Sequence, residues 1–352
     1  MAFSVTPEAF KVSPDLAKGI EGKRVLITGA GKDRGIGQGL ALACGLNGAA
    51  AVGVHFHSSY ADGLETVDAI TRAGGNAFPV QADVTNTSDV WSIRSYVIRK
   101  MVGLPPNLLI CNSGLAERGY LFGLAPKRVE GEAAAPRRAR VREAFVHNLR
   151  DSTAVINTKL DGFLYMTHLW AGEAIHFNEP LQIVYVSSRQ ALDPGAGVPG
   201  YVLANFGVLA LPRILRTNLG RRADLIRAFS VAYPFVRTGM TTAYVDNPKV
   251  FGRWQPRMLE THEAAQALLQ LLCRPSEELD DKIFQLNVTS GPAKGAATVQ
   301  LTWSAIELRP EEATLPWSAA QPLAVAGEAP RPAERGEPAD LAPAGSLPAS
   351  RY

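Results

Sequence analysis

Three residues between positions 159 and 201 have the chemical types that carbonyl reduction requires. Ser188 ends an apolar run, Tyr201 follows thirteen residues later, and Lys159 lies in the helical pattern NTKLDGFLYMTHL. Reduction needs a proton donor beside the carbonyl oxygen, a second donor that holds this oxygen, and a cation that lowers a tyrosine pKa from about 10 towards neutral pH. Each residue alone is usually structural. Together with a nucleotide site they predict these three roles, and Asn205, four residues after Tyr201, shares its helix face.

The nucleotide site is predicted from a glycine-rich turn. The run VLIT leads into TGAGKDRGIG, and the helical pattern QGLALACGL follows. Glycines let the backbone turn tightly and approach a pyrophosphate, which then lies on the free amides of the helix start. The strand before the turn and the helix after it supply the context that makes such a motif specific. The candidate residues in this turn are Gly29, Gly31, Lys32, Arg34, Gly35, Ile36 and Gly37.

The end of the second strand indicates which dinucleotide binds. NAD-binding proteins usually have an acidic residue there, which accepts from the ribose 2′-hydroxyl. This chain has His57, Ser58 and Ser59 instead, and hydroxyls with Lys32 or Arg34 suit a 2′-phosphate. We therefore expect NADPH/NADP, the alternative being that these are solvated loop residues. Later strand ends add candidate contacts to the adenine and the ribose: Asp83, Val84, Asn112, Ser113 and Gly114.

Short apolar runs alternate with longer helical patterns between residues 21 and 288. This alternation predicts an α/β fold, a Rossmann-type doubly wound parallel sheet of about seven strands flanked by helices. The runs are apolar throughout, as in strands covered on both faces. The expected strands are 24–28, 50–56, 77–81, 108–111, 181–187, 226–231 and 283–288, and the clearest helices are 36–46, 63–73 and 261–272.

Composition divides the chain into three regions. Residues 1–20 are a lead-in, 21–295 form the NADP-binding domain, and 296–352 are a C-terminal extension. From about residue 310 the extension is rich in Pro, Ala, Glu and Gly, and it buries too little apolar surface to offset its ordering entropy. We expect that part to be disordered.

An insertion at residues 115–150 is too long for a simple connection, so we expect a lid, a partner surface or a disordered segment. It carries eight basic residues against four acidic ones. A basic rim suits an acyl carrier protein or a coenzyme A thioester, and the alternative is a solvated helical face. The basic residues are Arg118, Lys127, Arg128, Arg137, Arg138, Arg140, Arg142 and Arg150; the acidic ones are Glu117, Glu130, Glu132 and Glu143.

Overall composition excludes several classes of protein. Apolar residues make up 46% and the net charge is only +3, which argues against a disordered chain and a nucleic-acid partner. We expect no membrane span, because no apolar stretch is long enough, and no secretory signal at the N-terminus. Three scattered cysteines predict neither a disulfide framework nor a metal site. These observations favour a cytoplasmic protein.

Several motifs resemble the short-chain dehydrogenase/reductase superfamily over residues 21–290. They are TGAGKDRGIG, ADV, CNSG, VSS, the spacing from Ser188 to Tyr201, and YPFVRTGM. The first half is most similar to 3-oxoacyl-acyl-carrier-protein reductases. The resemblance implies an NADP-dependent oxidoreductase in which Pro234, Val236 and Thr238 close over the cofactor. It also implies a homo-oligomer that pairs the helices at 158–170 and 201–219.

Three departures from the family pattern are informative. The glycine loop is two residues longer than TGxxxGxG, Phe235 replaces a glycine, and Asn205 stands where the family has lysine. Lys159 in turn stands where the family has a helical asparagine. This exchange is similar to that in ketoreductase domains of modular polyketide synthases and animal-type fatty acid synthases. The stretches TKLDGFLYM and YVLAN of this chain resemble the corresponding patterns of those domains. It implies that Lys159 supplies the missing cation and that Asn205 holds a proton-relay water.

The expected function is therefore NADPH-dependent reduction of a β-keto or polyketide-like acyl group. A dehydrogenase for another alcohol, such as a steroid or a sugar, would use the same four residues. A third interpretation is a nucleotide-binding scaffold or sensor that has lost turnover.

Overall fold

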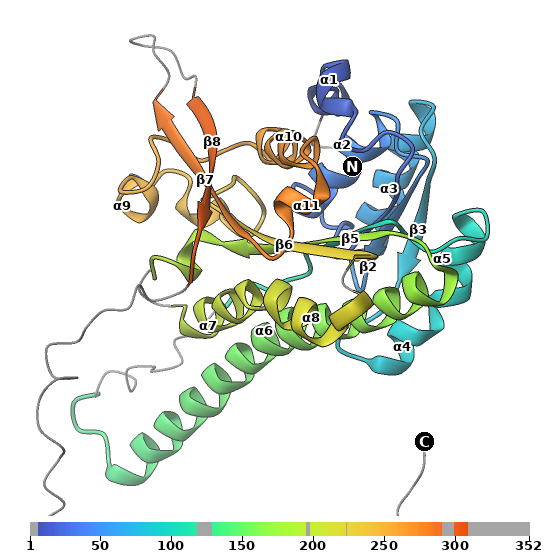
Figure 1. Cartoon of the computed structure of the whole chain (residues 1–352). Coiled ribbons are helices and arrows are strands. Elements are labelled where there is room, and N and C mark those ends of the chain that lie inside the picture. The colour runs from blue at the N-terminus through green and yellow to red at the C-terminus, as the bar shows by residue number, and fades with distance from the viewer. Residues whose placement is uncertain (1–5, 118–128, 195–197, 223, 291–298, 309–352) are drawn as a thin grey trace, which may run out of the picture. The chain divides into compact units, whose positions relative to one another are not determined.

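Eight strands form one sheet in the computed structural model, which describes residues 6–117, 129–194, 198–222, 224–290 and 299–308 (Figure 1). The order is β3-β2-β1-β4-β5-β6-β7-β8, and every pair is parallel except β7 with β8. The strand order reverses between β1 and β4, which opens a crevice at their carboxyl ends. The bounds are β1 Arg24–Ile27, β2 Ala51–Phe56, β3 Ala77–Gln81, β4 Leu108–Cys111, β5 Leu181–Ser188, β6 Ile226–Tyr233, β7 Ile283–Ser290 and β8 Val299–Ile306.

The central strands are buried on both faces, as their uninterrupted apolar sequences predict. Every residue of β2 and β4 is buried, and so is every residue of β5 except the last. A parallel strand needs cover on both faces, so it contains no alternating polar positions. The prediction of a Rossmann-type doubly wound α/β fold is confirmed.

Strand β8 was not predicted, because its residues were assigned to the C-terminal extension. It pairs with β7 from Ile283↔Ile306 to Ser290↔Val299. Its sequence VQLTWSAI alternates in burial, and the side chains of Val299, Leu301 and Trp303 pack on the core. The first unit of the chain therefore ends at Glu307, beyond the boundary expected at residue 295. The second unit is Leu308–Tyr352, and the segment expected to be disordered lies outside the described residues.

Helices cover the two faces of the sheet in two groups (Figure 1). The first group centres on α2 and α10, and the second on α6, α7 and α8. The larger helices are α2 Ile36–Gly45, α3 Tyr60–Arg72, α4 Thr87–Ser92, α5 Arg94–Lys100, α6 Ala134–Phe177, α7 Pro199–Leu209, α8 Leu211–Leu219 and α10 Thr261–Leu272. Single turns complete the set: α1 Pro14–Ala17, α9 Pro248–Phe251 and α11 Ser276–Leu279.

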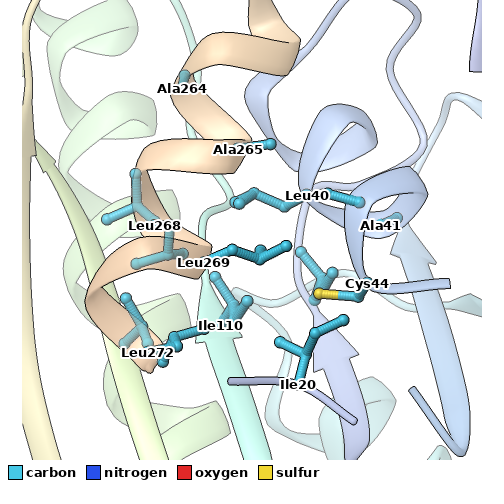
Figure 2. Packing of buried hydrophobic residues seen from close by; sticks show 14 of the residues in the cluster. Ile20, Leu40, Ala41, Cys44, Ile110, Ala264, Ala265, Leu268, Leu269 and Leu272 are labelled. Atoms are coloured by element: carbon cyan, nitrogen blue, oxygen red, sulfur yellow. The ribbon is translucent and has the colours of Figure 1, made fainter. Parts of the chain in front are cut away.

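Helix α2 is held in place by close packing on α10 (Figure 2). Figure 2 shows Ala265 and Leu269 of α10 directed towards Leu40 and Cys44 of α2, with Ile110 of β4 nearby. A Cβ at Gly39 would lie 3.1 Å from the carbonyl oxygen of Thr261, so a small residue is needed where the helices meet. This packing fixes the start of α2, where the glycine-rich turn ends.

The expected insertion is partly a continuous helix. Helix α6 begins at Ala134 and runs for 44 residues, so residues 134–150 are the first turns of the helix that carries Lys159. A disordered segment is therefore wrong for residues 134–150, and the alternative of a solvated helical face agrees with the structure there. Side chains of α6 up to residue 150 are half-buried or exposed, and the first buried side chain of the helix is that of Ser152. Residues 118–128, including Arg118, Lys127 and Arg128, lie outside the described residues.

Among the described residues, no helix combines the length and apolar character needed to span a bilayer. The same residues contain no cluster of His, Cys, Asp or Glu side chains suited to a metal. Cys44, Cys111 and Cys273 are all free thiols.

Candidate active site

A cavity of about 230 Å³ lies at the carboxyl ends of the central strands. Its walls come from the glycine-rich turn, the segments after β4, β5 and β6, and helices α6 and α7. This is the crevice that the reversal of strand order predicts. The predicted site residues in its lining are Gly29, Ile36, Gly37, Asn112, Gly114, Lys159, Ser188, Tyr201, Pro234, Val236 and Thr238.

Tyr201 and Ser188 reach the cavity from different elements. Tyr201 lies in the first turn of α7, and Ser188 is the last residue of β5. Burial raises the pKa of the Tyr201 phenol, and hydrogen bonding by the side chains of Ser188 and Asn205 opposes this rise. The phenol is therefore protonated at neutral pH, and a nearby cation would lower its pKa.

Lys159 is a buried cation in the wall of the same cavity. Its side chain is only 6% exposed, and Nζ donates to the carbonyl oxygen of Val186 at 2.7 Å. The ammonium lies 4.9 Å from the ring centroid of Phe163 and 3.8 Å from the position that a Cβ would take at Gly114. Burial lowers the Lys159 pKa to about 7, against a weaker opposing effect of Cys111. Near neutral pH the amine therefore exchanges between its charged and uncharged forms.

Asn205 lies one turn after Tyr201 and is fully buried outside the cavity lining. Its side-chain Nδ2 donates to the backbone carbonyl oxygen of Tyr201 at 2.9 Å. The backbone carbonyl oxygen of Asn205 accepts from Ser187 Oγ at 2.8 Å. Its Oδ1 is buried without a hydrogen-bond partner among the described residues. Such an orphan acceptor in a native protein calls for an explanation, and a bound water is one.

The glycine-rich turn is shaped for close approach to an anion. Gly29 adopts a φ of +66°, and a Cβ at Gly37 would lie 2.3 Å from the Gly29 carbonyl oxygen. The Asn112 side chain donates to the carbonyls of Thr28 and Gly29 at 3.1 and 3.2 Å, which fixes the turn. Helix α2 begins after Gly35 with no side-chain cap, so its first amides face an incoming anion. The turn therefore fits a pyrophosphate.

The residues expected at a 2′-phosphate lie outside the cavity lining, around the end of β2. Gly31 packs on Phe56, where a Cβ would come within 2.5 Å of the Phe56 Cβ, so the turn lies against this strand. The side chains of Lys32, Arg34, His57 and Ser58 are exposed, and those of Ser59 and Asp83 are half-buried. Asp83 Oδ1 accepts from the Thr85 amide and hydroxyl, both at 2.8 Å. The other predicted cofactor residues that do not line the cavity are Gly31, Gly35, Asp83, Val84 and Ser113.

Glu117 is a site residue that the sequence did not reveal. Its Oε2 accepts from the Tyr201 amide at 2.8 Å, and its Oε1 accepts from Ser152 Oγ at 2.6 Å and from the Gly200 amide at 3.3 Å. The carboxylate thus joins the segment after β4 to α6 and α7. One signal was present: Val198 precedes α7 and provides no side-chain cap. An uncapped helix start requires an acceptor from elsewhere.

Phe235 forms an aromatic wall where the family pattern has glycine. Its ring stacks on Trp254 at 5.5 Å between centroids. The buried side chain of Gln255 hydrogen-bonds to the backbone of Phe235. Its Oε1 accepts from the Phe235 amide and its Nε2 donates to the Phe235 carbonyl oxygen, both at 2.7 Å. Trp254 Nε1 donates to Asp193, which links the segments after β6 and β5.

The family described as short chain dehydrogenase matches residues 23–249. A hydroxynaphthalene reductase-like protein Arp2 from Metarhizium brunneum is 34% identical over 102 residues, 29% of this chain and 36% of that protein. The chain thus spans little more than a third of the length of that relative. The hydroxynaphthalene reductase arp2 of Aspergillus fumigatus is 28% identical over 216 residues, 60% of this chain and 67% of that protein.

Solved structures share the fold at lower identity. A short chain dehydrogenase from Burkholderia cenocepacia, solved in complex with NADP, matches with a TM-score of 0.59 and 20% identity. The alignment covers 76% of this chain and 96% of that one. At this identity the likeness shows the common architecture.

Proposed function

The chain belongs to the short chain dehydrogenases, a family of NAD(P)-dependent oxidoreductases, and from this premise we propose that it is an NADPH-dependent ketoreductase. The observation that carries the proposal is the position of Lys159. The chain lacks a lysine one turn after Tyr201, yet a buried amine from α6 lines the cavity that also holds Tyr201 and Ser188. The wall of the cavity thus contains an amine that could act as the cation in place of the missing lysine.

The four residues divide the reaction between them. NADPH, when bound, supplies the hydride that adds to the carbonyl carbon. Ser188 donates a hydrogen bond to the carbonyl oxygen, and Tyr201 transfers its phenolic proton to that oxygen, which gives the alcohol. Lys159 stabilises the resulting phenolate by its charge. Asn205, whose buried Oδ1 is free to accept, holds the water through which Tyr201 regains a proton.

Preference for NADPH is supported by the charge at the end of β2. Lys32 and Arg34 are exposed in the glycine-rich turn, whose Gly31 packs on Phe56 at the end of β2, and positions 57 to 59 carry His57, Ser58 and Ser59 rather than a carboxylate. A 2′-phosphate gains from cations and hydroxyls, whereas a 2′-hydroxyl gains from an acid. Mutation of Lys32 and Arg34 to Ala is expected to raise the KM for NADPH more than that for NADH.

A β-keto or polyketide-like acyl substrate, linked to a carrier protein or coenzyme A, is supported by the first turns of α6. Arg137, Arg138, Arg142 and Arg150 are exposed on this basic segment. An acidic carrier protein or the phosphates of coenzyme A complement such a surface. The relatives named as hydroxynaphthalene reductases support a reductive direction.

A second copy of the chain is the proposed partner of the outer faces of α6, α7 and α8. Leu164, Leu203, Phe206 and Ile214 are between 44 and 55% exposed there. Apolar side chains gathered on neighbouring helices are typical of subunit interfaces. Measurement of the molar mass in solution of wild type and of L203E/F206E tests the oligomer, and the variant is expected to have the smaller mass.

The free thiols support the cytoplasm as the compartment of the protein.

The proposal is tested by the oxidation of NADPH with S-acetoacetyl-N-acetylcysteamine, a soluble β-keto thioester. Wild type is expected to turn over, and Tyr201→Phe and Lys159→Ala are each expected to lose about 100-fold or more in kcat. Binding of NADPH serves as the folding control. Near-wild-type turnover by Lys159→Ala would refute the assigned roles. Binding of NADPH without reduction of any activated ketone would favour the scaffold, and turnover confined to steroids or sugars would favour the second interpretation.

A further inference from the structure

Arg189 is a cation in the cavity that the proposed reaction does not use. It directly follows Ser188, begins a short 3₁₀ turn at Arg189–Ala191, and lines the cavity together with Gln190. Its Nε is buried without a hydrogen-bond partner in the described part of the chain, and the same holds for Gln190 Oε1. Two adjacent side chains therefore present unsatisfied polar atoms beside the residue that holds the carbonyl oxygen.

The neighbouring acids are already engaged. Asp193 accepts from Trp254 Nε1 and forms an ion pair with Arg253 at 3.2 Å. Glu117, the acid in the cavity lining, accepts from Ser152, Gly200 and Tyr201. Burial lowers the pKa of the Arg189 guanidinium, an effect that Asp193 opposes and Arg253 reinforces. A guanidinium nevertheless stays charged in proteins, and Arg189 forms no ion pair with a carboxylate of the described residues, since Asp193 is paired with Arg253.

The position of Arg189 determines what it can bind. The phosphate end of the cavity is formed by Gly29, Ile36 and Gly37, whereas Arg189 extends from the carboxyl end of β5, next to Ser188. A group bound by Arg189 thus lies close to the carbonyl being reduced. A β-keto acyl group has a second oxygen two carbons away from its ketone.

We propose that Arg189 is a specificity-determining residue that binds this second oxygen, and that the enzyme thereby selects β-dicarbonyl substrates over simple ketones. The inference rests on the proposed ketoreductase function and deepens it. The second oxygen is the carbonyl oxygen of a thioester or the carboxylate of a free β-keto acid. Both accept a charge-assisted hydrogen bond from a guanidinium.

A binding experiment tests the proposal without turnover. Acetoacetate is titrated into wild type, R189M, R189K and R213M in the presence of saturating NADP, which cannot reduce it. R189M is expected to bind about 10- to 100-fold more weakly, as for the loss of a hydrogen bond to a charged group, and R189K is expected to lie between. R213M is the matched control, because Arg213 is exposed on α8 and pairs with Asp281. Equal affinity of wild type and R189M, or binding to neither, overturns the proposal.

A kinetic experiment identifies the source of the second oxygen. Values of kcat/KM are compared for S-acetoacetyl-N-acetylcysteamine, acetoacetate and 2-pentanone, which lacks the second oxygen. Wild type is expected to prefer the dicarbonyl compounds, and R189M is expected to lose that preference. The dicarbonyl compound with the higher kcat/KM shows whether the second oxygen belongs to a thioester or to a free acid. An equal loss on all three compounds overturns the proposal. Failure of wild type to reduce any of them contradicts the ketoreductase function, while the binding experiment still decides the role of Arg189.

Discussion

The Glu117 carboxylate accepts a hydrogen bond from the backbone amide of Tyr201 at 2.8 Å. The two residues are 84 positions apart, and the bond holds the first turn of α7 against the segment after β4. Since Glu117 also accepts from Ser152 of α6, one side chain positions the helices that carry Tyr201 and Lys159. Glu117 is thus a positioning residue for the proposed reaction.

Mutation of Glu117 to Ala is expected to lower kcat about 10- to 100-fold, because displacement of the Tyr201 phenol by a fraction of an ångström weakens proton transfer. The affinity for NADPH should not change, since the glycine-rich turn is untouched. Ser152→Ala is the control, because it keeps the bond from Glu117 to Tyr201 and should retain most activity. E117Q, which keeps an acceptor oxygen, should recover part of the loss. Steady-state kinetics with all three variants checks this, and equal losses in E117A and S152A would contradict it.

The pH dependence of reduction should report the charge of Lys159. Burial lowers the Lys159 pKa to about 7, while burial raises that of Tyr201, so Lys159 loses its proton first as pH rises. We expect kcat/KM for reduction to fall as pH increases through about 7, because the uncharged amine no longer stabilises the phenolate. A pH profile of wild type and K159M measures this. K159M should be slow, with no inflection near 7, and an unchanged inflection in that variant would assign it to another group.

Acid should destabilise the protein partly through His55. This side chain is 1% exposed, and burial lowers its pKa from 6.5 to about 4. Between these pH values the unfolded state binds a proton that the folded state does not, so the free energy of unfolding falls as pH decreases, by up to about 3 kcal/mol. Denaturant unfolding at several pH values should show this loss in wild type and a smaller one in H55N. Exposed His57 is the control, and H57N should behave as wild type.

Two glycines on helices should respond to alanine in opposite ways. A Cβ at Gly37 would lie 2.3 Å from the Gly29 carbonyl oxygen, so G37A should distort the turn. We expect NADPH binding to weaken by about 10-fold or more, which is the cost of one lost hydrogen bond. A Cβ at Gly172 on α6 would meet no atom within 4 Å. G172A should therefore be stabilised by about 0.5–1 kcal/mol and remain active, because alanine restricts the unfolded chain. Cofactor titration and thermal unfolding of both variants measure these effects, and tight NADPH binding by G37A would be the contrary result.

Much of the fold was predictable because the signals are local. Uninterrupted apolar runs predict the seven strands from β1 to β7. The helix predicted at residues 261–272 has the same bounds as α10 in the structure. The glycine-rich turn was readable because glycine is needed where a side chain would strike the backbone, as at Gly37. Strand β8 was not predicted, because its residues were assigned by composition to the C-terminal extension. In the structure the burial of its side chains alternates, as expected for a strand with one covered face.

The sequence by itself determined the types of residue in the site: a phenol, a hydroxyl and an amine downstream of a nucleotide turn. Only the tertiary structure decided that the Lys159 amine is buried in the cavity wall, that Glu117 holds the start of α7, and that the acids around Arg189 are engaged. The physical reason is the range of the interactions. Periodicity and turn residues express contacts between near neighbours, whereas burial and charge pairing depend on atoms that the folded chain brings together from distant positions.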